Sequence, residues 1–216
     1  MIQTLTFSES GASHINEDAV SLKPHPSDSR IWLCALADGQ GGRSGGFAAA
    51  NLAVSHSITS ARALSANQLA DCSAWERVAR QADITVQNDP QAGLTTLVCL
   101  SISTDQVCGV SSGDSAALLL MNGKSMILTE KQAKNPPVGS GAAIFRCFSS
   151  PLVVPWKLMV MSDGVWKYLG WERLITLSQR SNGNDLISNL TDTVRSLHRG
   201  HFPDDFTVAV LQKLTA

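Results

Sequence analysis

The sequence predicts an α+β fold in which helices pack on the outside of one or two antiparallel sheets. Strand-like runs at the N-terminus are followed by helix-like segments, then by four successive strand-like runs, further helices and one last strand. Four runs separated only by short turns are typical of an antiparallel meander, not of alternating β-α units. The chain has 216 residues, 44% of them hydrophobic, which is enough for one sizeable core. We therefore expect a single domain over residues 1–216.

Three strands and two helices are predicted in the first half of the chain. Apolar runs bounded by turn residues indicate the strands, and an alanine-rich stretch with apolar residues at helical spacing indicates the first helix. The second helix follows a capping residue and ends before Asp89-Pro90. The strands cover residues 2–8, 17–22 and 31–37, and the helices cover residues 47–64 and 74–88.

The second half begins with the meander, whose strands are rich in valine, leucine and isoleucine. Asn122-Gly123 between its last two strands is a preferred dipeptide of a type I′ hairpin turn. Residues 130–141 have no periodicity and are predicted to form a loop. The meander covers residues 95–103, 106–111, 115–121 and 125–128, two strands cover 143–148 and 157–161, two amphipathic helices cover 171–180 and 184–198, and the last strand covers 206–211.

The composition excludes several classes of function. The net charge of −1 gives no electrostatic signature of a protein that binds nucleic acid or an anionic membrane. The first residues lack the basic and apolar regions of a signal peptide, and Pro155 and Lys157 interrupt the longest apolar segments. The five cysteines include no C-x-x-C pair, which favours buried free thiols. We expect a cytoplasmic protein.

One stretch combines a strand, a carboxylate and a cluster of glycines. The apolar residues 31–37 are followed by Asp38, and five glycines lie between Gly39 and Gly46. Glycine lets a ligand approach the main chain closely. An aspartate at a strand end beside bare peptide carbonyls suits a hard divalent cation, although a glycine-rich connection into the next helix explains this stretch equally well.

Further aspartates stand at strand boundaries, at Asp18, Asp114, Asp163 and the pair Asp204-Asp205. Each one alone resembles an ordinary turn or cap residue. If the strands are neighbours, however, their ends bring several carboxylates to one opening, where their repulsion calls for cations. Carboxylates without histidine or cysteine at metal-ligand spacing favour Mg²⁺ or Mn²⁺ over zinc or copper. Two such ions can activate a water for attack on phosphorus.

These motifs occur in the order found in the PP2C-type (PPM) metal-dependent protein phosphatases, and the sequence resembles that family over nearly its whole length. The resemblance implies a four-layer α-β-β-α sandwich of two antiparallel sheets flanked by helices. The motifs are Asn16-Glu17-Asp18, Asp38-Gly39-Gln40-Gly41-Gly42, Thr95-Thr96, Gly113-Asp114-Ser115, Ser162-Asp163-Gly164 and Asp204-Asp205.

The resemblance also implies a metal centre with two Mg²⁺ or Mn²⁺ ions and room for a third. Asp18 would be the carboxylate that orients metal-bound water, and Asp114 matches the position that holds the third ion in bacterial members. The implied core ligands are Asp38, which bridges both ions, the main-chain carbonyl of Gly39, Asp163 and Asp204.

The substrate phosphate site departs from the family pattern. The family carries an arginine five residues before the aspartate of the first motif, and here that position is Ser13, with His14 beside it. A serine donates one neutral hydrogen bond and cannot make the bidentate contact of a guanidinium. Ser13 and His14 are therefore predicted to be weak phosphate contacts. Arg43 is another candidate, although a solvated loop charge explains it as well.

Three further features depart from the family pattern. The family's final motif is Asp-Asn, whereas this chain has Asp204-Asp205, which leaves the role of Asp205 open. The position of a family general acid is Gln40, which has no useful proton to donate. Bacterial members carry a longer flap between Leu128 and Ala143, and because only a short loop remains here, their substrate selectivity is not implied.

The leading hypothesis is a metal-dependent serine/threonine protein phosphatase, a hydrolase that attacks phosphoserine or phosphothreonine with a water activated by two ions. The resemblance implies a phosphorylated protein substrate, a pairing with a serine/threonine kinase, and a monomer. One alternative is a pseudophosphatase or regulatory phosphoprotein-binding module with little turnover, which the missing arginine favours. Another is a regulatory phosphatase that acts on an anti-sigma-factor antagonist.

Overall fold

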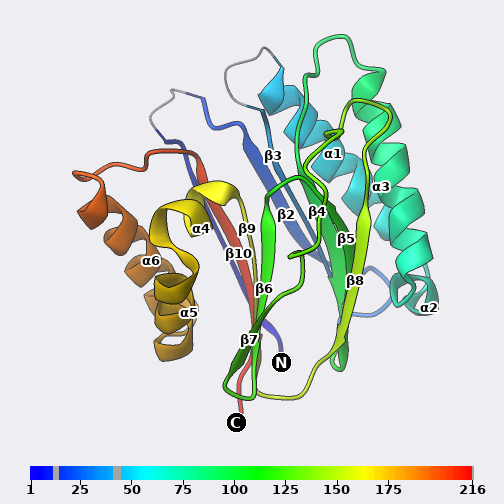
Figure 1. Ribbon diagram of the computed structural model, residues 1–216. Helices are drawn as coiled ribbons and strands as arrows, with labels where there is room; N and C mark the ends of the chain where they lie inside the picture. The colour runs from blue at the N-terminus through cyan, green and yellow to red at the C-terminus, as the bar shows by residue number, and fades with distance from the viewer. Residues whose placement is uncertain (12–14, 41–44, 216) are drawn as a thin grey trace.

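Two five-stranded antiparallel sheets lie face to face in the computed structural model, with helices on both outer sides (Figure 1). The structure describes residues 1–11, 15–40 and 45–215. The strand order is β1-β10-β9-β6-β7 in one sheet and β2-β3-β4-β5-β8 in the other. This arrangement confirms the predicted α+β sandwich of four layers.

The strands and helices of the described residues have the following bounds. The strands are β1 Gln3–Glu9, β2 Asp18–Pro24, β3 Trp32–Asp38, β4 Leu97–Ile102, β5 Gln106–Ser112, β6 Ala116–Met121, β7 Lys124–Ile127, β8 Arg146–Pro151, β9 Trp156–Met161 and β10 Phe206–Lys213. The helices are α1 Gly46–Ala61, α2 Ala66–Leu69, α3 Cys72–Gln87, α4 Asp163–Leu169, α5 Trp171–Arg180 and α6 Gly183–Leu197.

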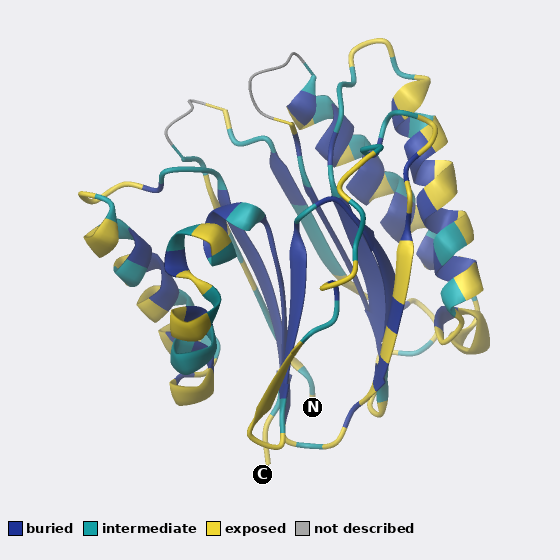
Figure 2. Cartoon of the chain, in the orientation of Figure 1, coloured by how far each residue is buried: buried dark blue, intermediate teal, exposed yellow. Residues whose placement is uncertain are grey.

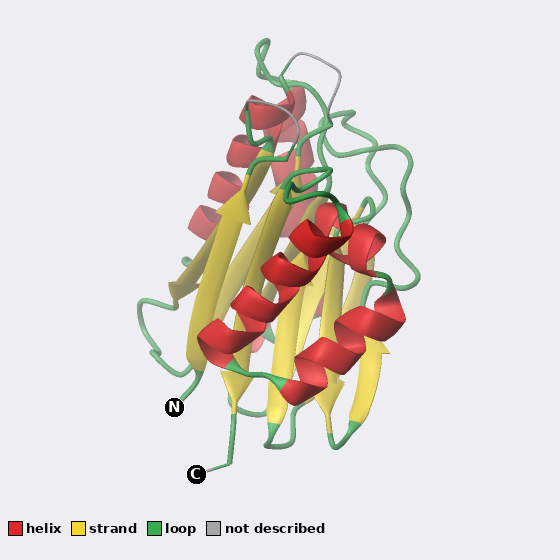
Figure 3. Ribbon diagram, turned by 90° about the vertical axis from the view of Figure 1, so that its left-hand side faces the viewer, coloured by secondary structure: helices red, strands yellow, loops and turns green. Residues whose placement is uncertain are grey.

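The central strands of both sheets are buried on both faces, and their period-two alternation divides the side chains of each between two cores (Figure 2). In β9, Leu158 and Val160 pack between the sheets, whereas Met159 and Met161 pack against the helices α4, α5 and α6. Figure 3 shows these helices lying over the sheet that contains β9. The other sheet packs its outer face, including Leu33, against α1 and α3. Every strand that leads into the candidate site is therefore fixed by apolar contacts on both sides.

The hairpin predicted between the last two strands of the meander is present between β6 and β7. Asn122 and Gly123 have φ angles of 54° and 73°, as a type I′ turn requires. The predicted strand over residues 143–148 is shifted, because β8 begins only at Arg146. The amide of Ala143 donates to the Asp83 carboxylate instead of to a neighbouring strand, and this interaction keeps residues 143–145 in the preceding loop.

Helix α4 was not predicted from the sequence. The residues from Met159 onward indicate a strand that ends at an Asp-Gly pair, but the main chain turns into a helix directly after Ser162. The amide of Val165 donates to the carbonyl of Ser162 and closes the first turn. Asp163 consequently lies in the first turn of α4, where the helix dipole favours a carboxylate.

The described part of the chain contains no helix with the length and apolar character needed to cross a membrane. All five cysteines are free thiols. Cys34, Cys99 and Cys108 are buried as expected, whereas Cys72 is half-buried and Cys147 is exposed.

Candidate functional site

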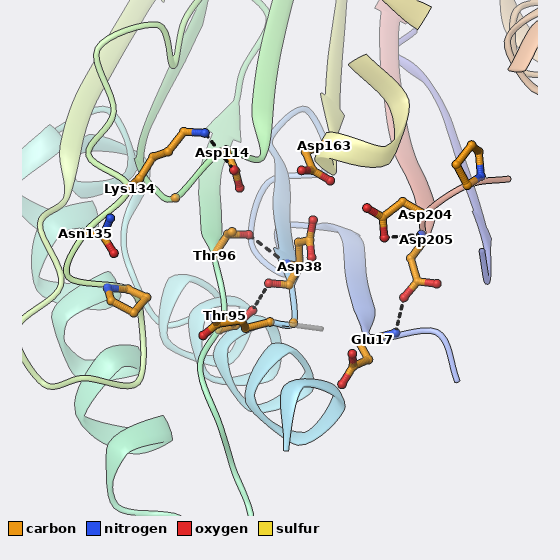
Figure 4. Close-up of a pocket in the computed structure, with 15 residues that line it drawn as sticks. Glu17, Asp38, Thr95, Thr96, Asp114, Lys134, Asn135, Asp163, Asp204 and Asp205 are labelled. Atoms are coloured by element: carbon orange, nitrogen blue, oxygen red, sulfur yellow. Dashed lines mark hydrogen bonds and ion pairs between the residues drawn. The ribbon is translucent and has the colours of Figure 1, made fainter. Parts of the chain in front are cut away.

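Strand ends from both sheets bring the four predicted metal-ligand aspartates, Asp38, Asp114, Asp163 and Asp204, to the rim of one cavity of about 560 Å³ (Figure 4). Asp18 begins β2 and lies directly opposite Asp38 at the end of β3. The other three come from the turn between β5 and β6, the start of α4 and the segment before β10. The cavity is lined by Asp38, Gly39, Asp114, Asp163 and Asp204, together with Glu17 and Asp205.

Hydrogen bonds from the neighbouring strand segment fix the main chain of Asp38. Its amide donates to Thr96 Oγ1 at 2.9 Å, and its carbonyl accepts from Thr95 Oγ1 at 2.8 Å and from the Thr96 amide at 2.9 Å. The Gly39 amide donates to the Glu17 carbonyl at 3.1 Å. A Cβ atom on Gly39 would lie 2.4 Å from the Gly46 carbonyl oxygen, so this position requires glycine. The Thr95-Thr96 motif thus holds the strand end that presents the Asp38 carboxylate.

Negative charge accumulates around Asp38. Burial raises the pKa of Asp38 well above its usual value of 3.8, and the charges of Asp18, Asp163, Asp114 and Asp204 raise it further. Burial together with the nearby Asp114 charge likewise raises the pKa of Asp163, against the opposing effect of Lys167. Without a cation, this group of carboxylates therefore holds more protons at neutral pH than free aspartates would.

Asp18 is buried behind Asp38. It is 7% exposed, and burial raises its pKa even though a hydrogen bond from Ser162 opposes the shift. The Ser162 hydroxyl donates to Asp18 Oδ2 at 2.7 Å, whereas Asp18 Oδ1 has no hydrogen-bond partner. A buried carboxylate oxygen without a partner is costly unless an additional donor or a cation satisfies it.

The donor chemistry of the site fits a hard divalent cation. Every predicted ligand provides an oxygen atom, and no histidine or cysteine lines the cavity among the described residues. Within the same described ranges, however, no three acidic, histidine or cysteine side chains already converge as a metal-binding group. The carboxylates surround one cavity, and their oxygens are the donors that would hold Mg²⁺ or Mn²⁺ there.

The two adjacent aspartates of the last motif have different environments, which the sequence could not distinguish. Asp205 accepts the Gly11 amide at 2.8 Å and the Glu17 amide at 2.6 Å, one on each carboxylate oxygen. Asp205 therefore joins the segment before β10 to the connection between β1 and β2. Asp204 lines the cavity, and its Oδ1 accepts the amide of Asp205 at 3.1 Å.

Sequence reasoning missed two lysines beside the acidic residues. Lys134 forms an ion pair with Asp114 at 3.1 Å, and Lys167 forms one with Asp163 at 3.3 Å. The signal for Lys167 was its spacing of four residues from Asp163, which places both on one face of a helix, but α4 was not predicted. The predicted phosphate contacts Ser13 and His14, and the alternative Arg43, lie outside the described residues.

A family model described as stage II sporulation protein E (SpoIIE) matches residues 28–213 of this chain. The chain belongs to this family. The SpoIIE family is PP2C-like, so the match confirms the family predicted from the motifs. The matched region starts after Asp18 and includes every other aspartate of the site. No curated protein matches the sequence.

Several solved structures, including structures of serine/threonine phosphatases, share the fold of this chain. The serine/threonine phosphatase Stp1 from Staphylococcus aureus has 17% identity and a TM-score of 0.82, with 100% of this chain and 96% of that chain covered. The catalytic domain of the serine/threonine protein phosphatase PstP in complex with two manganese ions has 20% identity and a TM-score of 0.80, with 99% of each chain covered. RsbX in complex with magnesium has 17% identity and a TM-score of 0.75, with 98% of this chain and 94% of that chain covered.

The raised pKa of Asp38 leads to a prediction about the metal-free protein. Because folding raises this pKa above 3.8, the folded state binds more protons than the unfolded state once the pH exceeds that value. The free energy of unfolding should therefore fall as the pH rises through the raised pKa. Asp38→Asn should raise the melting temperature at pH 8 in chelator by about 2–4 °C, the equivalent of about 1 kcal/mol for a chain of this size.

Thermal melts from pH 5 to pH 9 in chelator would test this. The difference between the wild type and Asp38→Asn should increase with pH, and a variant less stable than the wild type at pH 8 would contradict the charge argument. Asp192→Asn, which changes an exposed aspartate on α6, serves as the matched control.

The contacts of the last motif lead to a second prediction. Asp205→Ala should destabilise the protein by about 1–3 kcal/mol, because it leaves two main-chain amides without their charged acceptor. Asp204→Ala removes a cavity-lining carboxylate and should change stability much less. Urea denaturation of both variants in chelator measures the difference, and equal losses of stability would show that the Asp205 contacts do not support the fold.

Proposed function

We propose that this chain is a Mg²⁺- or Mn²⁺-dependent serine/threonine protein phosphatase that hydrolyses phosphoserine and phosphothreonine. The observation that carries the proposal is the concentration of partly buried aspartates around Asp38, at the strand ends of a PP2C-type fold. Such an arrangement is costly unless cations offset its charge. The manganese complex of the phosphatase PstP and the magnesium complex of RsbX, both structurally similar to this chain, support the choice of metal.

Each residue has a distinct role in this proposal. Asp38 would contact both core ions, while Asp163, Asp204 and the Gly39 carbonyl would complete the ligand set. Two bound ions would lower the pKa of a water and neutralise the oxygens of the phosphate. Asp18 would accept a hydrogen bond from that water through the oxygen that has no partner in the protein.

Proton delivery and the third ion depend on other residues of the cavity. Gln40 lines the cavity, but its amide has no useful proton to give to a leaving group, so a water at the proposed metal centre would supply that proton. Asp114 is our candidate for a third, weaker site, because it lies at the rim with its carboxylate 31% exposed. The single domain proposed for residues 1–216 would contain all of these groups.

The biological setting of the proposed phosphatase includes its substrate, its location and its oligomeric state. The motifs of the chain would serve a regulatory phosphatase and a phosphatase paired with a serine/threonine kinase equally well. The proposed substrate is a phosphorylated protein, and we expect the chain to act in the cytoplasm as a monomer. A pseudophosphatase with little turnover is the alternative, and the serine at the arginine position favours it.

Metal-dependent hydrolysis of a phosphoserine peptide tests the proposal. The wild type should be active with Mn²⁺ or Mg²⁺ and inactive with chelator. Asp38→Asn should lower kcat by at least about a hundredfold, because removing the shared ligand forfeits several kcal/mol of transition-state stabilisation. Asp163→Asn and Asp204→Asn should each cost at least about tenfold.

The outcome separates the two functions. Asp192→Asn provides the control, because this exposed aspartate lies on α6 and should leave kcat unchanged. Peptide binding without metal-dependent release of phosphate would support the pseudophosphatase. Turnover in Asp38→Asn above about a tenth of the wild-type rate would show that the metal assignment is wrong.

A further inference from the structure

The loop between β7 and β8, residues 128–145, forms one wall of the cavity. Lys134, Asn135 and Pro137 from this loop line the cavity. Figure 4 shows Lys134 and Asn135 on the side of the cavity away from Asp204 and Asp205. Among the described residues that line it, Lys134 is the one cation. The loop thus contributes a positive charge to an otherwise acidic surface.

The loop is fixed just before Lys134. The Gly113 amide donates to the Ala133 carbonyl at 2.8 Å, and Gln132 Nε2 donates to the Ser115 carbonyl at 2.9 Å. Both contacts join the loop to the turn between β5 and β6, which carries Asp114. The main chain of Lys134 is therefore held beside that turn.

A second set of contacts fixes the loop after Lys134. The amide of Thr95 donates to the Val138 carbonyl at 2.9 Å, and the amide of Val138 donates to the Thr95 carbonyl at 3.1 Å. Thr95 also holds the carbonyl of Asp38 through its hydroxyl. The loop is thus paired with the same residue that fixes the strand end of Asp38.

A buried carboxylate on α3 fastens the remainder of the loop. Asp83 is 3% exposed, and its two oxygens accept the amides of Gly139, Gly141 and Ala143 at 2.6, 3.1 and 3.1 Å. Charged acceptors make stronger hydrogen bonds than neutral ones, and burying one is costly unless it is satisfied in this way. The loop therefore forms an ordered wall of the cavity, and Asp83 on α3 holds it in position.

The Lys134 ammonium itself remains free to move. Its side chain is 64% exposed, and its only described ion pair is with Asp114. Exposed ion pairs of this kind contribute little free energy, so the ammonium can exchange Asp114 for a more strongly charged partner. A phosphate dianion in the cavity would be such a partner, since an ammonium group can give it three hydrogen bonds.

We propose that Lys134 binds the phosphoryl oxygens of the substrate and so supplies the positive charge that is missing at Ser13, the position of the family's arginine. Asp83 is the positioning residue, because it holds the loop that carries Lys134. This inference rests on the proposed function, because it assumes a phosphorylated substrate in this cavity. The competing role for Lys134 is only to neutralise Asp114.

Saturation kinetics with a small aryl phosphate and a phosphoserine peptide, at fixed Mn²⁺ and pH, test the proposal. Lys134→Ala should raise KM by about tenfold with kcat changed less, because the contact exists in the ground state and the transition state alike. Lys134→Arg should keep KM within about threefold of the wild type, since the charge is retained. Lys131→Ala, which changes an exposed lysine of the same loop, should have no effect.

Binding of inorganic phosphate, measured by calorimetry in the presence of Mg²⁺, separates this proposal from the proposed function. Lys134→Ala should weaken phosphate binding by about the same factor as it raises KM, whether or not the wild type turns over a substrate. Unchanged phosphate binding together with an unchanged KM would overturn the proposal. If the wild type hydrolyses no substrate but still binds phosphate in a way that depends on Lys134, only the proposed function would be overturned.

Double mutants distinguish the specific roles. If Lys134 acts only on Asp114, Lys134→Ala should leave phosphate binding unchanged in an Asp114→Ala background, whereas our proposal predicts the same tenfold loss there. Asp83→Asn replaces a charged acceptor with an amide and should raise KM in the wild type but add little in Lys134→Ala. An equal KM increase from Asp83→Asn in both backgrounds would show that Asp83 does not act through Lys134.

Discussion

The burial of negative charge at Asp38 is the constraint on which the rest of the site depends. Carboxylates near one another in a medium of low dielectric repel strongly, and here one of them begins β2 directly opposite the end of β3. The strand that carries Asp38 is apolar and buried from Leu33 to Ala37, so the fold cannot relieve the repulsion by letting this strand move into water. The sandwich therefore holds the carboxylates close together, and bound cations would offset their negative charge.

Aspartates perform two different jobs around this charge, and their hydrogen bonds distinguish them. Asp83 and Asp205 each accept hydrogen bonds from main-chain amides of loops on both carboxylate oxygens. These two residues therefore connect segments that are distant in sequence. Asp38 and Asp163 instead line one cavity without such partners on both oxygens, and the charge of Asp163 raises the pKa of Asp38. Thr95 connects the two groups, because it contacts both the strand end of Asp38 and the loop that Asp83 holds.

Much of the fold could be predicted from the sequence, because buried strands separated by tight turns leave a clear pattern, and the repeated association of strand ends with Asp-Gly pointed to Asp38 and Asp163. Other features had no local signal. Helix α4 starts immediately after a strand, and its 7 residues are too few to show a helical period in the sequence. Asp83 is one polar residue of an amphipathic helix, and only the folded loop shows what it binds. Adjacent residues of equal chemistry, such as Asp204 and Asp205, can be told apart only by their partners.

The position of the cation at the cavity bears on how a substrate would be recognised. A phosphate dianion approaching several aspartates meets repulsion unless positive charge lies both deep in the cavity and at its rim. A guanidinium would grip two oxygens in a fixed plane, whereas an exposed lysine offers a mobile point charge with little geometric demand. Recognition of the phosphoryl group through Lys134 would therefore be tolerant, and selectivity would have to come from the protein surface around the loop. The hydrogen bonds from the loop to Asp83 then matter, because they fix the main chain from which the mobile Lys134 ammonium reaches into the cavity.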